Sequence, residues 1–132
     1  MSVDIKHRAV QFHTLPAPAG PYSPAVIFDR LVFISGQGAK DSATGRLVGS
    51  DIESQTEQVL KNISSILEAA GSSLAHVVRC GVFLTDIADF AAMNAVYSRV
   101  FEANRPARTT VQVSSLPMPG LRVEIDAIAY IP

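Results

Sequence analysis

The chain has 132 residues, of which 48% are hydrophobic and 17% are charged, and its net charge at pH 7 is −1. This composition is typical of one globular domain, here residues 1–132, and excludes an intrinsically disordered chain. The sequence has no basic run and no apolar run of about 20 residues, so we expect neither nucleic acid nor a membrane as a partner.

Few residues are available for disulfide or metal chemistry. Cys80 is the single cysteine and cannot form an internal disulfide, and the histidines at positions 7, 13 and 76 lack metal-ligand spacing. The first ten residues, MSVDIKHRAV, carry early charges and lack the apolar core of a signal peptide. We therefore expect a cytoplasmic protein that uses no metal and no cofactor.

The N-terminal quarter predicts a short strand followed by a loop. Residues 8–13 alternate weakly between polar and apolar side chains and predict an edge strand. Residues 14–24 contain four prolines, which exclude a helix and a central strand. Tyr22 in this loop either packs over the core or presents its ring and hydroxyl to a site.

Two apolar runs, residues 25–28 and 31–35, predict a β-hairpin across Asp29-Arg30. The second run leads into the segment Gly36-Gln37-Gly38. These glycines either form a plain turn or expose backbone N–H groups to an anion. Their spacing is not that of a phosphate-binding loop.

The clearest predicted helix covers residues 50–71. Ser50 and Glu53 fit a capping box, and Gly71 fits the helix end. Its polar residues lie largely outside an apolar stripe at helical spacing, so we interpret this helix as structural.

Residues 76–84 predict a strand with Val78 and Cys80 on its buried face. Cys80 is then a small buried hydrophobic side chain, unless a nearby base or cation converts it to a nucleophilic thiolate. Only Arg79 adjoins it, and Arg79 points to the other face, which disfavours the nucleophile.

A second predicted helix begins at Asp86 and ends before Pro106. Asn94 lies beside its apolar stripe, where it either caps a sheet end or reaches a pocket. The stripe repeats at helical spacing and contains Ile87, Phe90, Met93, Val96, Tyr97, Val100 and Phe101.

The last quarter, residues 106–131, has two alternating runs around a turn at 114–120. Strict alternation predicts two strands that send their odd-numbered residues to the core. Arg108, Thr110 and Glu124 are then expected together on the opposite face. They either bind a small anion and a water molecule or form a solvated sheet face.

The order of elements is strand, strand, helix, strand, helix, strand, strand. This order predicts an α+β fold in which two helices pack on one face of a single mixed β-sheet. The other face combines the polar residues named above with Ile128 and Tyr130. A half-apolar open face indicates a homo-oligomer with sites at its subunit boundaries.

Six segments, in order and covering nearly the whole chain, carry a resemblance to a known family. They are AGPYSPA (19–25), FISGQ (33–37), DIESQTEQVLKNI (51–63), DIADFAAMNAVYSRVF (86–101), PARTTVQV (106–113) and VEIDAIA (123–129). The chain resembles the RidA/YjgF/UK114 family of small enamine and imine deaminases, also labelled endoribonuclease L-PSP. This resemblance implies a chorismate-mutase-like fold and a homotrimer with clefts between subunits.

The resemblance also implies roles for residues that match the family pattern. Arg108 matches the arginine that binds a substrate carboxylate. A guanidinium group pairs with a carboxylate through two hydrogen bonds. Glu124 matches the glutamate that holds or activates the attacking water. The implied substrate-binding residues are Tyr22, Ser35, Gly36, Asn94, Arg108 and Thr110, with Gln37 nearby.

Two positions depart from the family pattern. Thr110 stands where many members have a cysteine, so cysteine-based reactivity is absent there, although the hydroxyl can donate to a ligand oxygen. Pro24 replaces the usual glutamine and alters the loop or the pocket entrance. No lysine is needed for a Schiff base, and Lys6, Lys40 and Lys61 are all expected outside the site.

The implied activity is that of a 2-iminobutanoate/2-iminopropanoate deaminase, which converts 2-enamino and 2-imino acids to 2-oxo acids and ammonia. One alternative is a catabolic deaminase of a larger unsaturated amino acid such as 2-aminomuconate, indicated by a wider pocket near Pro24 and residues 36–49. Another is a non-enzymatic, chaperone-like trimer that binds 2-oxo acids. A ribonuclease is disfavoured because the chain has no basic patch and no histidine pair at a shared site.

Overall fold

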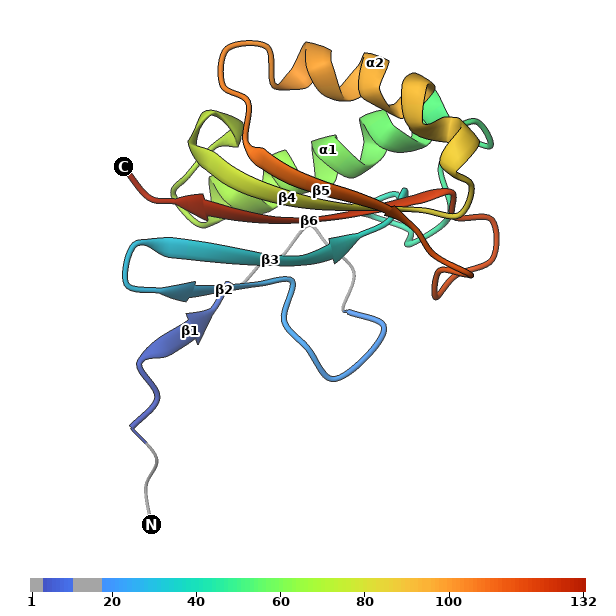
Figure 1. Cartoon of the computed structure of the whole chain (residues 1–132). Coiled ribbons are helices and arrows are strands. Elements are labelled where there is room, and N and C mark those ends of the chain that lie inside the picture. Colours follow the sequence, from blue (N-terminus) through green and yellow to red (C-terminus); the bar gives the residue numbers. More distant parts are fainter. Residues whose placement is uncertain (1–3, 11–17) are drawn as a thin grey trace.

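Two helices lie on one face of a single sheet in the computed structural model of the chain, which describes residues 4–10 and 18–132 (Figure 1). The six strands follow the order β1-β2-β3-β6-β4-β5. Only β4 and β5 pair in parallel among the described strands. The predicted α+β fold with one mixed sheet is therefore confirmed. The elements are β1 (His7–Ala9), β2 (Ala25–Phe28), β3 (Leu31–Gln37), α1 (Ile52–Ala69), β4 (Val77–Leu84), α2 (Phe90–Val100), β5 (Ala107–Gln112) and β6 (Val123–Tyr130).

The predicted hairpin of β2 and β3 is confirmed, with Asp29 at φ 56° in its two-residue turn. Aspartate adopts this left-handed conformation more readily than most residues. β3 continues to Gln37, and its register against β6 shifts between Ile34 and Gln37. Gly36 thus lies within a strand, so the prediction of a plain turn at this residue is wrong.

The N-terminal strand is short and lies at the edge of the sheet. β1 starts one residue before the predicted strand at 8–13, and most of the remainder of that strand lies outside the described residues. The predicted loop at 14–24 is described only from residue 18, and residues 18–24 contain neither helix nor strand.

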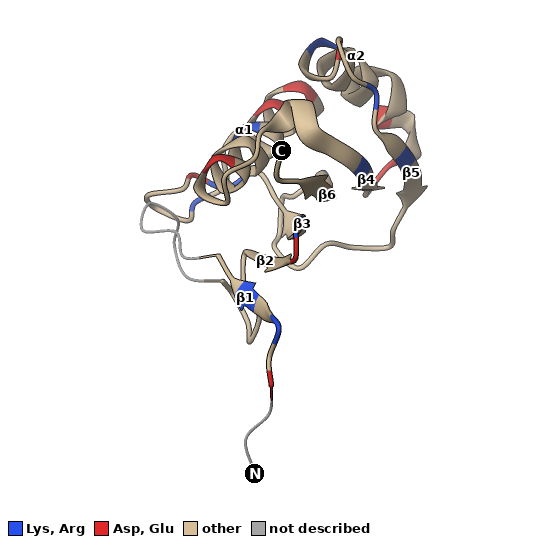
Figure 2. Ribbon diagram, turned by 90° about the vertical axis from the view of Figure 1, so that its left-hand side faces the viewer, with Lys and Arg blue, Asp and Glu red and all other residues tan. Residues whose placement is uncertain are grey.

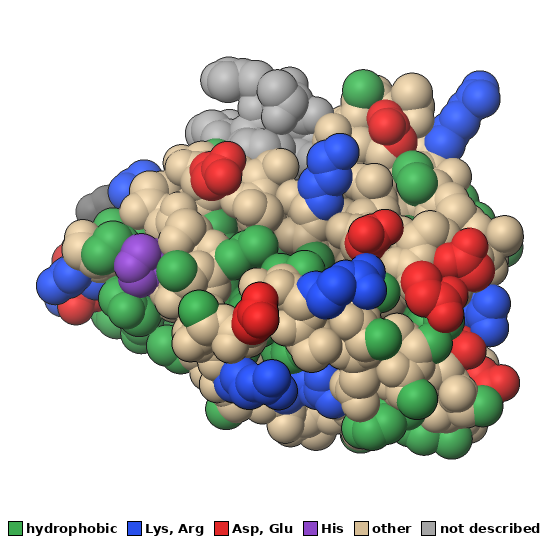
Figure 3. Space-filling view, turned by 90° about the horizontal axis from the view of Figure 1, so that it is seen from above, with side chains coloured by type: hydrophobic (Ala, Val, Ile, Leu, Met, Phe, Trp, Pro, Cys, Tyr) green, Lys and Arg blue, Asp and Glu red, His purple; other side chains and the backbone are tan. Residues whose placement is uncertain are grey.

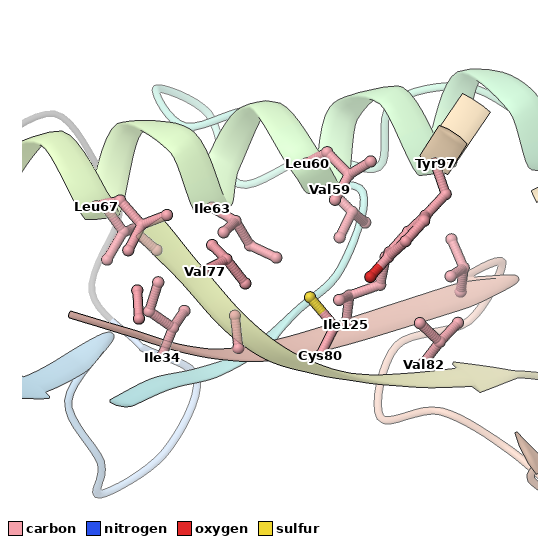
Figure 4. Close-up of a cluster of buried hydrophobic side chains, with 14 of the residues drawn as sticks. Ile34, Val59, Leu60, Ile63, Leu67, Val77, Cys80, Val82, Tyr97 and Ile125 are labelled. Atoms are coloured by element: carbon pink, nitrogen blue, oxygen red, sulfur yellow. The ribbon is translucent and has the colours of Figure 1, made fainter. Parts of the chain in front are cut away.

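The N-cap residue of α1 is Asp51, one residue after Ser50, which the capping box predicted. The carboxylate of Asp51, not the hydroxyl of Ser50, accepts a hydrogen bond of 2.7 Å from the backbone N–H of Ser54. Gly71 follows the helix end at φ 85°, as predicted. The helix buries a row of aliphatic side chains against the sheet, among them Val59, Leu60, Ile63 and Leu67 (Figure 4). Ile66 of the same helix is also buried.

β4 contains a shift of register against β6 between Val77 and Arg79. As a result Val77 is buried while Val78 is 44% exposed, so the prediction that Val78 faces the core is wrong. Cys80 is fully buried, and burial raises the pKa of its thiol. The prediction of a small buried hydrophobic cysteine is confirmed.

The second predicted helix is divided in two. Asp86 caps a short 3₁₀ turn, Ile87–Asp89, and α2 itself starts at Phe90. Ile87 is 50% exposed and Phe90 is 41% exposed, so the predicted buried stripe was wrong in its first turn. The buried side chains of the stripe are Met93, Val96, Tyr97 and Phe101.

The two C-terminal strands differ in which face they bury. β6 follows the predicted alternation, whereas Thr109 and Val111 of β5 are exposed. In the register of the sheet, Arg108 pairs with Cys80 and Cys80 pairs with Ala127. Paired residues on neighbouring strands point to the same face. Arg108 therefore points to the face that carries the helices.

The two faces of the sheet are covered unequally. α1 and α2 stack on one face, and no helix of the described residues covers the other (Figure 2). The helical side of the molecule carries charges of both signs side by side (Figure 3). Across residues 4–10 and 18–132, no helix is long and apolar enough to cross a membrane. The same residues contain no group of three His, Cys, Asp or Glu side chains able to hold a metal ion.

Candidate functional site

The side chain of Arg108 is held against α2. Its Nη2 donates a hydrogen bond of 2.7 Å to Oδ1 of Asn94. The guanidinium carbon lies 4.6 Å from the centre of the Tyr97 ring and 5.6 Å from that of Phe90. These three partners lie on one face of α2, and cation–π contacts stabilise a guanidinium over an aromatic ring. Because a guanidinium has five N–H donors, further donors remain for an anion.

A groove of about 540 Å³ lies beside Arg108, between α2 and the start of β5, and we call it the α2 groove. Neither aspartate nor glutamate is among its lining residues, so no carboxylate there neutralises Arg108. A guanidinium binds a carboxylate through two parallel hydrogen bonds, so the α2 groove suits a ligand with a carboxylate. Its lining residues are Asn94, Ala95, Tyr97, Ser98, Phe101, Arg105, Pro106 and Arg108.

Tyr97 forms the floor beneath Arg108. Its hydroxyl points down toward Cys80 in the core (Figure 4) and has no hydrogen-bond partner among the described residues. Burial, and then the neighbouring Cys80 thiol, raise the pKa of Tyr97. Tyr97 is therefore a neutral ring that supports Arg108 and not an acid or a base at neutral pH.

Glu124 lies on the opposite face of the sheet, paired in register with Phe83. Its carboxylate lies directly over Gly36, where an added Cβ would be 2.6 Å from Oε2 of Glu124. Burial, and then the Asp126 carboxylate, raise the pKa of Glu124, while Lys40 opposes them. The open face thus carries a carboxylate that binds a proton more readily than an exposed glutamate does.

Within one chain, the sheet separates Arg108 and Thr110 from Glu124. Thr110 pairs with the buried Val82 and so faces the helices, as Arg108 does. The prediction that these three residues share the open face is therefore wrong. The error arises on β5, whose even-numbered residues face the helices.

Ser35 connects the proline-rich loop to β3. Its Oγ donates to the carbonyl of Ser23 at 2.7 Å, and its backbone N–H donates to the carbonyl of Pro24 at 3.0 Å. Tyr22 in this loop is 50% exposed, so the prediction that it packs over the core is wrong. Tyr22 and Pro24 instead line a depression shared with Gly36, Gln37 and Lys40.

The structure therefore divides the predicted site residues into two sets, one on each side of the sheet. Arg108, Asn94 and Thr110 lie on the helix face, whereas Tyr22, Ser35, Gly36 and Glu124 lie at or beside the open face. Lys40 was expected outside the site but lines the depression beside Gly36 and influences the pKa of Glu124.

Sequence reasoning missed a second pairing of an acid with a glycine. Asp126 Oδ1 accepts a hydrogen bond of 2.8 Å from the backbone N–H of Gly81, where an added Cβ would lie 2.5 Å from that oxygen. Asp126 thus lies over Gly81 as Glu124 lies over Gly36. A glycine inside a predicted strand signals the close approach of another group, and this signal was available for Gly81 but not for Gly36, which follows the predicted strand at 31–35.

Residues 12–131 match the sequence model of the family described as Endoribonuclease L-PSP. The chain belongs to this family. It is the RidA/YjgF/UK114 family expected from the six sequence segments, so that resemblance is confirmed.

Individual relatives are similar over most of their length. A RutC family protein of Pyrococcus horikoshii is 51% identical over 115 residues, 87% of this chain and 90% of that protein. A 2-iminobutanoate/2-iminopropanoate deaminase of Capra hircus is 47% identical over 122 residues, 92% of this chain and 88% of that protein. The crystal structure of E. coli TdcF with bound serine has a TM-score of 0.86 at 36% identity, over 93% of this chain and 98% of that one.

Proposed function

We propose that this protein hydrolyses 2-imino acids, which exchange with 2-enamino acids, to 2-oxo acids and ammonia. A relative named for this reaction is 47% identical over 92% of the chain. A structural neighbour holds serine, which also has a carboxylate next to a carbon bonded to nitrogen. The observation that carries the proposal is the guanidinium of Arg108, fixed on α2 beside a groove without carboxylates.

In this proposal Arg108 binds the substrate carboxylate through two hydrogen bonds. Asn94, Tyr97 and Phe90 hold the guanidinium before the substrate arrives, so little entropy is lost when it binds. The bound carboxylate fixes the position of the adjacent imine carbon. Thr110 faces the helices as Arg108 does but does not line the α2 groove. Hydrolysis does not require a thiol at this position.

Glu124 acts as the general base. The water oxygen forms a bond to the imine carbon, Glu124 takes a proton from the water, and the electrons of the C=N double bond move to nitrogen. Glu124 returns this proton to nitrogen, which gives a neutral carbinolamine. The nitrogen then gains a second proton as the hydroxyl loses one, the C=O bond forms, and the C–N bond breaks to release ammonia. The raised pKa of Glu124 suits this role, because a more basic carboxylate removes a proton from water more readily.

One active site requires two copies of the chain, because the sheet separates Arg108 from Glu124 within each copy. A closed ring of three copies, the assembly that the family resemblance implies, would form an equivalent site at every boundary. Each site would combine Arg108, Asn94 and Thr110 of one copy with Tyr22, Ser35, Gly36 and Glu124 of its neighbour.

The open face supports this association through its large exposed apolar side chains. Side chains of this size in one patch are typical of a surface that another protein covers. Arg79 and Asp126 on the same face add charges of opposite sign, which can orient two copies of one surface. The apolar side chains are Phe28, Leu31, Phe33, Val111 and Tyr130, each between 40% and 49% exposed.

The test couples a pyridoxal-phosphate dehydratase acting on serine or threonine to the detection of ammonia or 2-oxo acid. Wild-type protein should accelerate their release, and Arg108→Ala should accelerate it far less. A wild type that adds nothing to the uncatalysed rate would make the proposal wrong. Binding of 2-oxobutyrate without turnover of any imine would instead indicate a non-enzymatic trimer that binds 2-oxo acids.

The second candidate is deamination of a larger unsaturated amino acid such as 2-aminomuconate. The α2 groove, about 540 Å³, favours it, whereas the depression beside Pro24, where a wider pocket was expected for such a substrate, measures only about 70 Å³. RNA cleavage has less support, because His76 packs edge-on against Tyr130 and hydrogen-bonds Ser73, away from the groove. Comparison of kcat/KM for short and long 2-imino acids separates the first two candidates.

A further inference from the structure

The α2 groove contains a second cation that imine hydrolysis does not use. Arg105 lines the groove together with Arg108, and neither aspartate nor glutamate is among the lining residues. The helical side elsewhere carries acids and bases side by side (Figure 3). Two guanidinium groups on one concave surface without a carboxylate attract an anion with more than one charged group.

Arg105 has no partner within the described part of the chain: no ion pair or side-chain hydrogen bond involves it. Other arginines near α2 are paired. Arg122 contacts Asp89 at 3.0 Å, and Arg99 contacts Glu57 at 3.8 Å. Arg105 is also exposed within one copy of the chain, so no residue of that copy covers its side chain.

The groove has more room than a short imino acid needs. A four-carbon 2-imino acid has about seven non-hydrogen atoms, which occupy roughly 200 Å³ if each takes no more than the ~30 Å³ of a water molecule. The groove measures about 540 Å³. A ligand anchored on Arg108 can therefore extend along the groove toward Arg105.

We propose that the α2 groove binds 2-imino acids with a second anionic group, with the first carboxylate on Arg108 and the distal carboxylate on Arg105. Arg105 is then a specificity-determining residue. A guanidinium at this position favours a planar carboxylate that can accept two hydrogen bonds. This inference rests on the proposed imine hydrolysis, since it assigns the substrate class of the same site.

The first test measures binding of two stable 2-oxo acids by isothermal titration calorimetry. The probes are 2-oxobutyrate, which has one carboxylate, and 2-oxoglutarate, which has two. Wild type should bind 2-oxoglutarate about fivefold more tightly, the upper range for one exposed ion pair. Arg105→Gln should lower that ratio to about one, and raising the salt concentration should also reduce it in wild type.

Arg99→Gln is the matched control, because it removes the same charge from an exposed arginine of α2 that does not line the groove. It should keep the wild-type ratio. If both substitutions change the ratio equally, long-range charge explains the preference and the inference is wrong. If wild type shows no preference for 2-oxoglutarate, the inference is wrong as well.

The second test measures turnover of imines that a flavin-dependent amino acid oxidase forms in situ from glutamate or from 2-aminobutyrate. Arg105→Gln should raise KM for the dicarboxylic imine about fivefold relative to the monocarboxylic one, with less effect on kcat, since Arg105 contacts the distal carboxylate. Hydrolysis of the monocarboxylic imine without any dicarboxylic preference would overturn this inference alone. Hydrolysis of neither imine would overturn the proposed function and this inference together.

Discussion

The two faces of the sheet hold the candidate catalytic groups in opposite ways. On the helix face, α2 fixes Arg108 through Asn94 and two aromatic rings. On the open face, Glu124 lies over Gly36, which has no side chain, and Asp126 and Lys40 influence its charge. The candidate cation is therefore preorganised within one chain, whereas the proposed base would need a second copy to face a substrate bound on Arg108. A site divided between two faces of one sheet can be complete only in an oligomer.

The largest effect is expected from the open face. Glu124→Gln keeps the shape of the side chain but removes the base, so kcat should fall by about 1000-fold, or to the uncatalysed rate, in the coupled assay. Affinity for 2-oxobutyrate should change much less, because Arg108 holds the carboxylate. Retention of wild-type kcat in this variant would show that the open face does not supply the base.

The pH dependence of activity should follow Glu124. Because its pKa is raised above the value of about 4.3 of an exposed glutamate, kcat/KM should fall as pH decreases through this raised pKa. The acid limb should therefore lie above the pH at which an exposed glutamate titrates, and Glu124→Gln should lack it. An acid limb that persists in this variant would belong to another group.

Ionisation of Glu124 should raise activity but lower the stability of the fold. A carboxyl group with a raised pKa in the folded state stabilises the fold below its unfolded pKa, and this contribution is lost as pH rises through the folded pKa. At pH 7 the ionised side chain thus lowers stability. Glu124→Gln should therefore have a higher Tm than wild type at pH 7, and this difference should disappear in acid. A lower Tm at pH 7 would mean that Glu124 stabilises the assembled protein.

The next largest effect is expected from the helix face. Arg108→Ala should lower kcat/KM by about 100-fold, because the substrate carboxylate loses its charged partner. Arg108→Lys should recover only part of this loss, since an ammonium group lacks the planar fork. Arg99→Gln removes an equal charge outside the groove and should leave kcat/KM unchanged. Equal losses in Arg99→Gln and Arg108→Ala would indicate a general charge effect.

Sequence patterns predicted the buried face correctly in strands where one face is apolar and the other is charged. β6 alternates apolar and charged residues over its whole length, so its buried face was predicted correctly. β5 contains Arg108, Thr109, Thr110, Val111 and Gln112, and only Val111 is strongly apolar. A strand with so little contrast does not reveal its inward face, and an error of one residue reverses every side chain.

The family resemblance supplied the candidate site residues, whereas the sequence did not predict how they are arranged. The family resemblance selected Arg108 and Glu124, while only the sheet register places them on opposite faces. The cation–π support from Phe90 could not be predicted from helical periodicity, which placed Phe90 in the core. The paired glycines at 36 and 81 were visible in the sequence, but the acids above them depend on strand pairing.

A smaller effect is expected from the glycine beneath the base. Gly36→Ala would put a Cβ 2.6 Å from Oε2 of Glu124 and so displace the carboxylate. Misplacing a catalytic group by a fraction of an ångström should lower kcat about tenfold, with little loss of stability since the side-chain end can move. Gly81→Ala is the matched control, because it displaces Asp126 instead. A greater loss of kcat in Gly81→Ala would mean that Asp126 contributes more to the reaction than Glu124 does.

The smallest effect is expected from the floor of the α2 groove. Tyr97→Phe keeps the ring under Arg108 and removes a buried hydroxyl that has no hydrogen-bond partner among the described residues. Loss of an unsatisfied buried hydroxyl should raise the free energy of unfolding by up to about 1 kcal/mol. Chemical denaturation measures this change. A loss of kcat/KM as large as that of Arg108→Ala would show that the hydroxyl acts on the substrate.

Subunit mixing tests the divided site most directly. Arg108→Ala and Glu124→Gln should each retain about 1% or less of wild-type activity alone. The two variants are unfolded together in equal amounts, refolded and assayed. If each site takes Arg108 from one copy and Glu124 from the next, random trimers should regain about a quarter of the wild-type sites. Separately refolded samples mixed afterwards serve as the control. A mixture that remains as inactive as its parents would contradict a site shared between two copies.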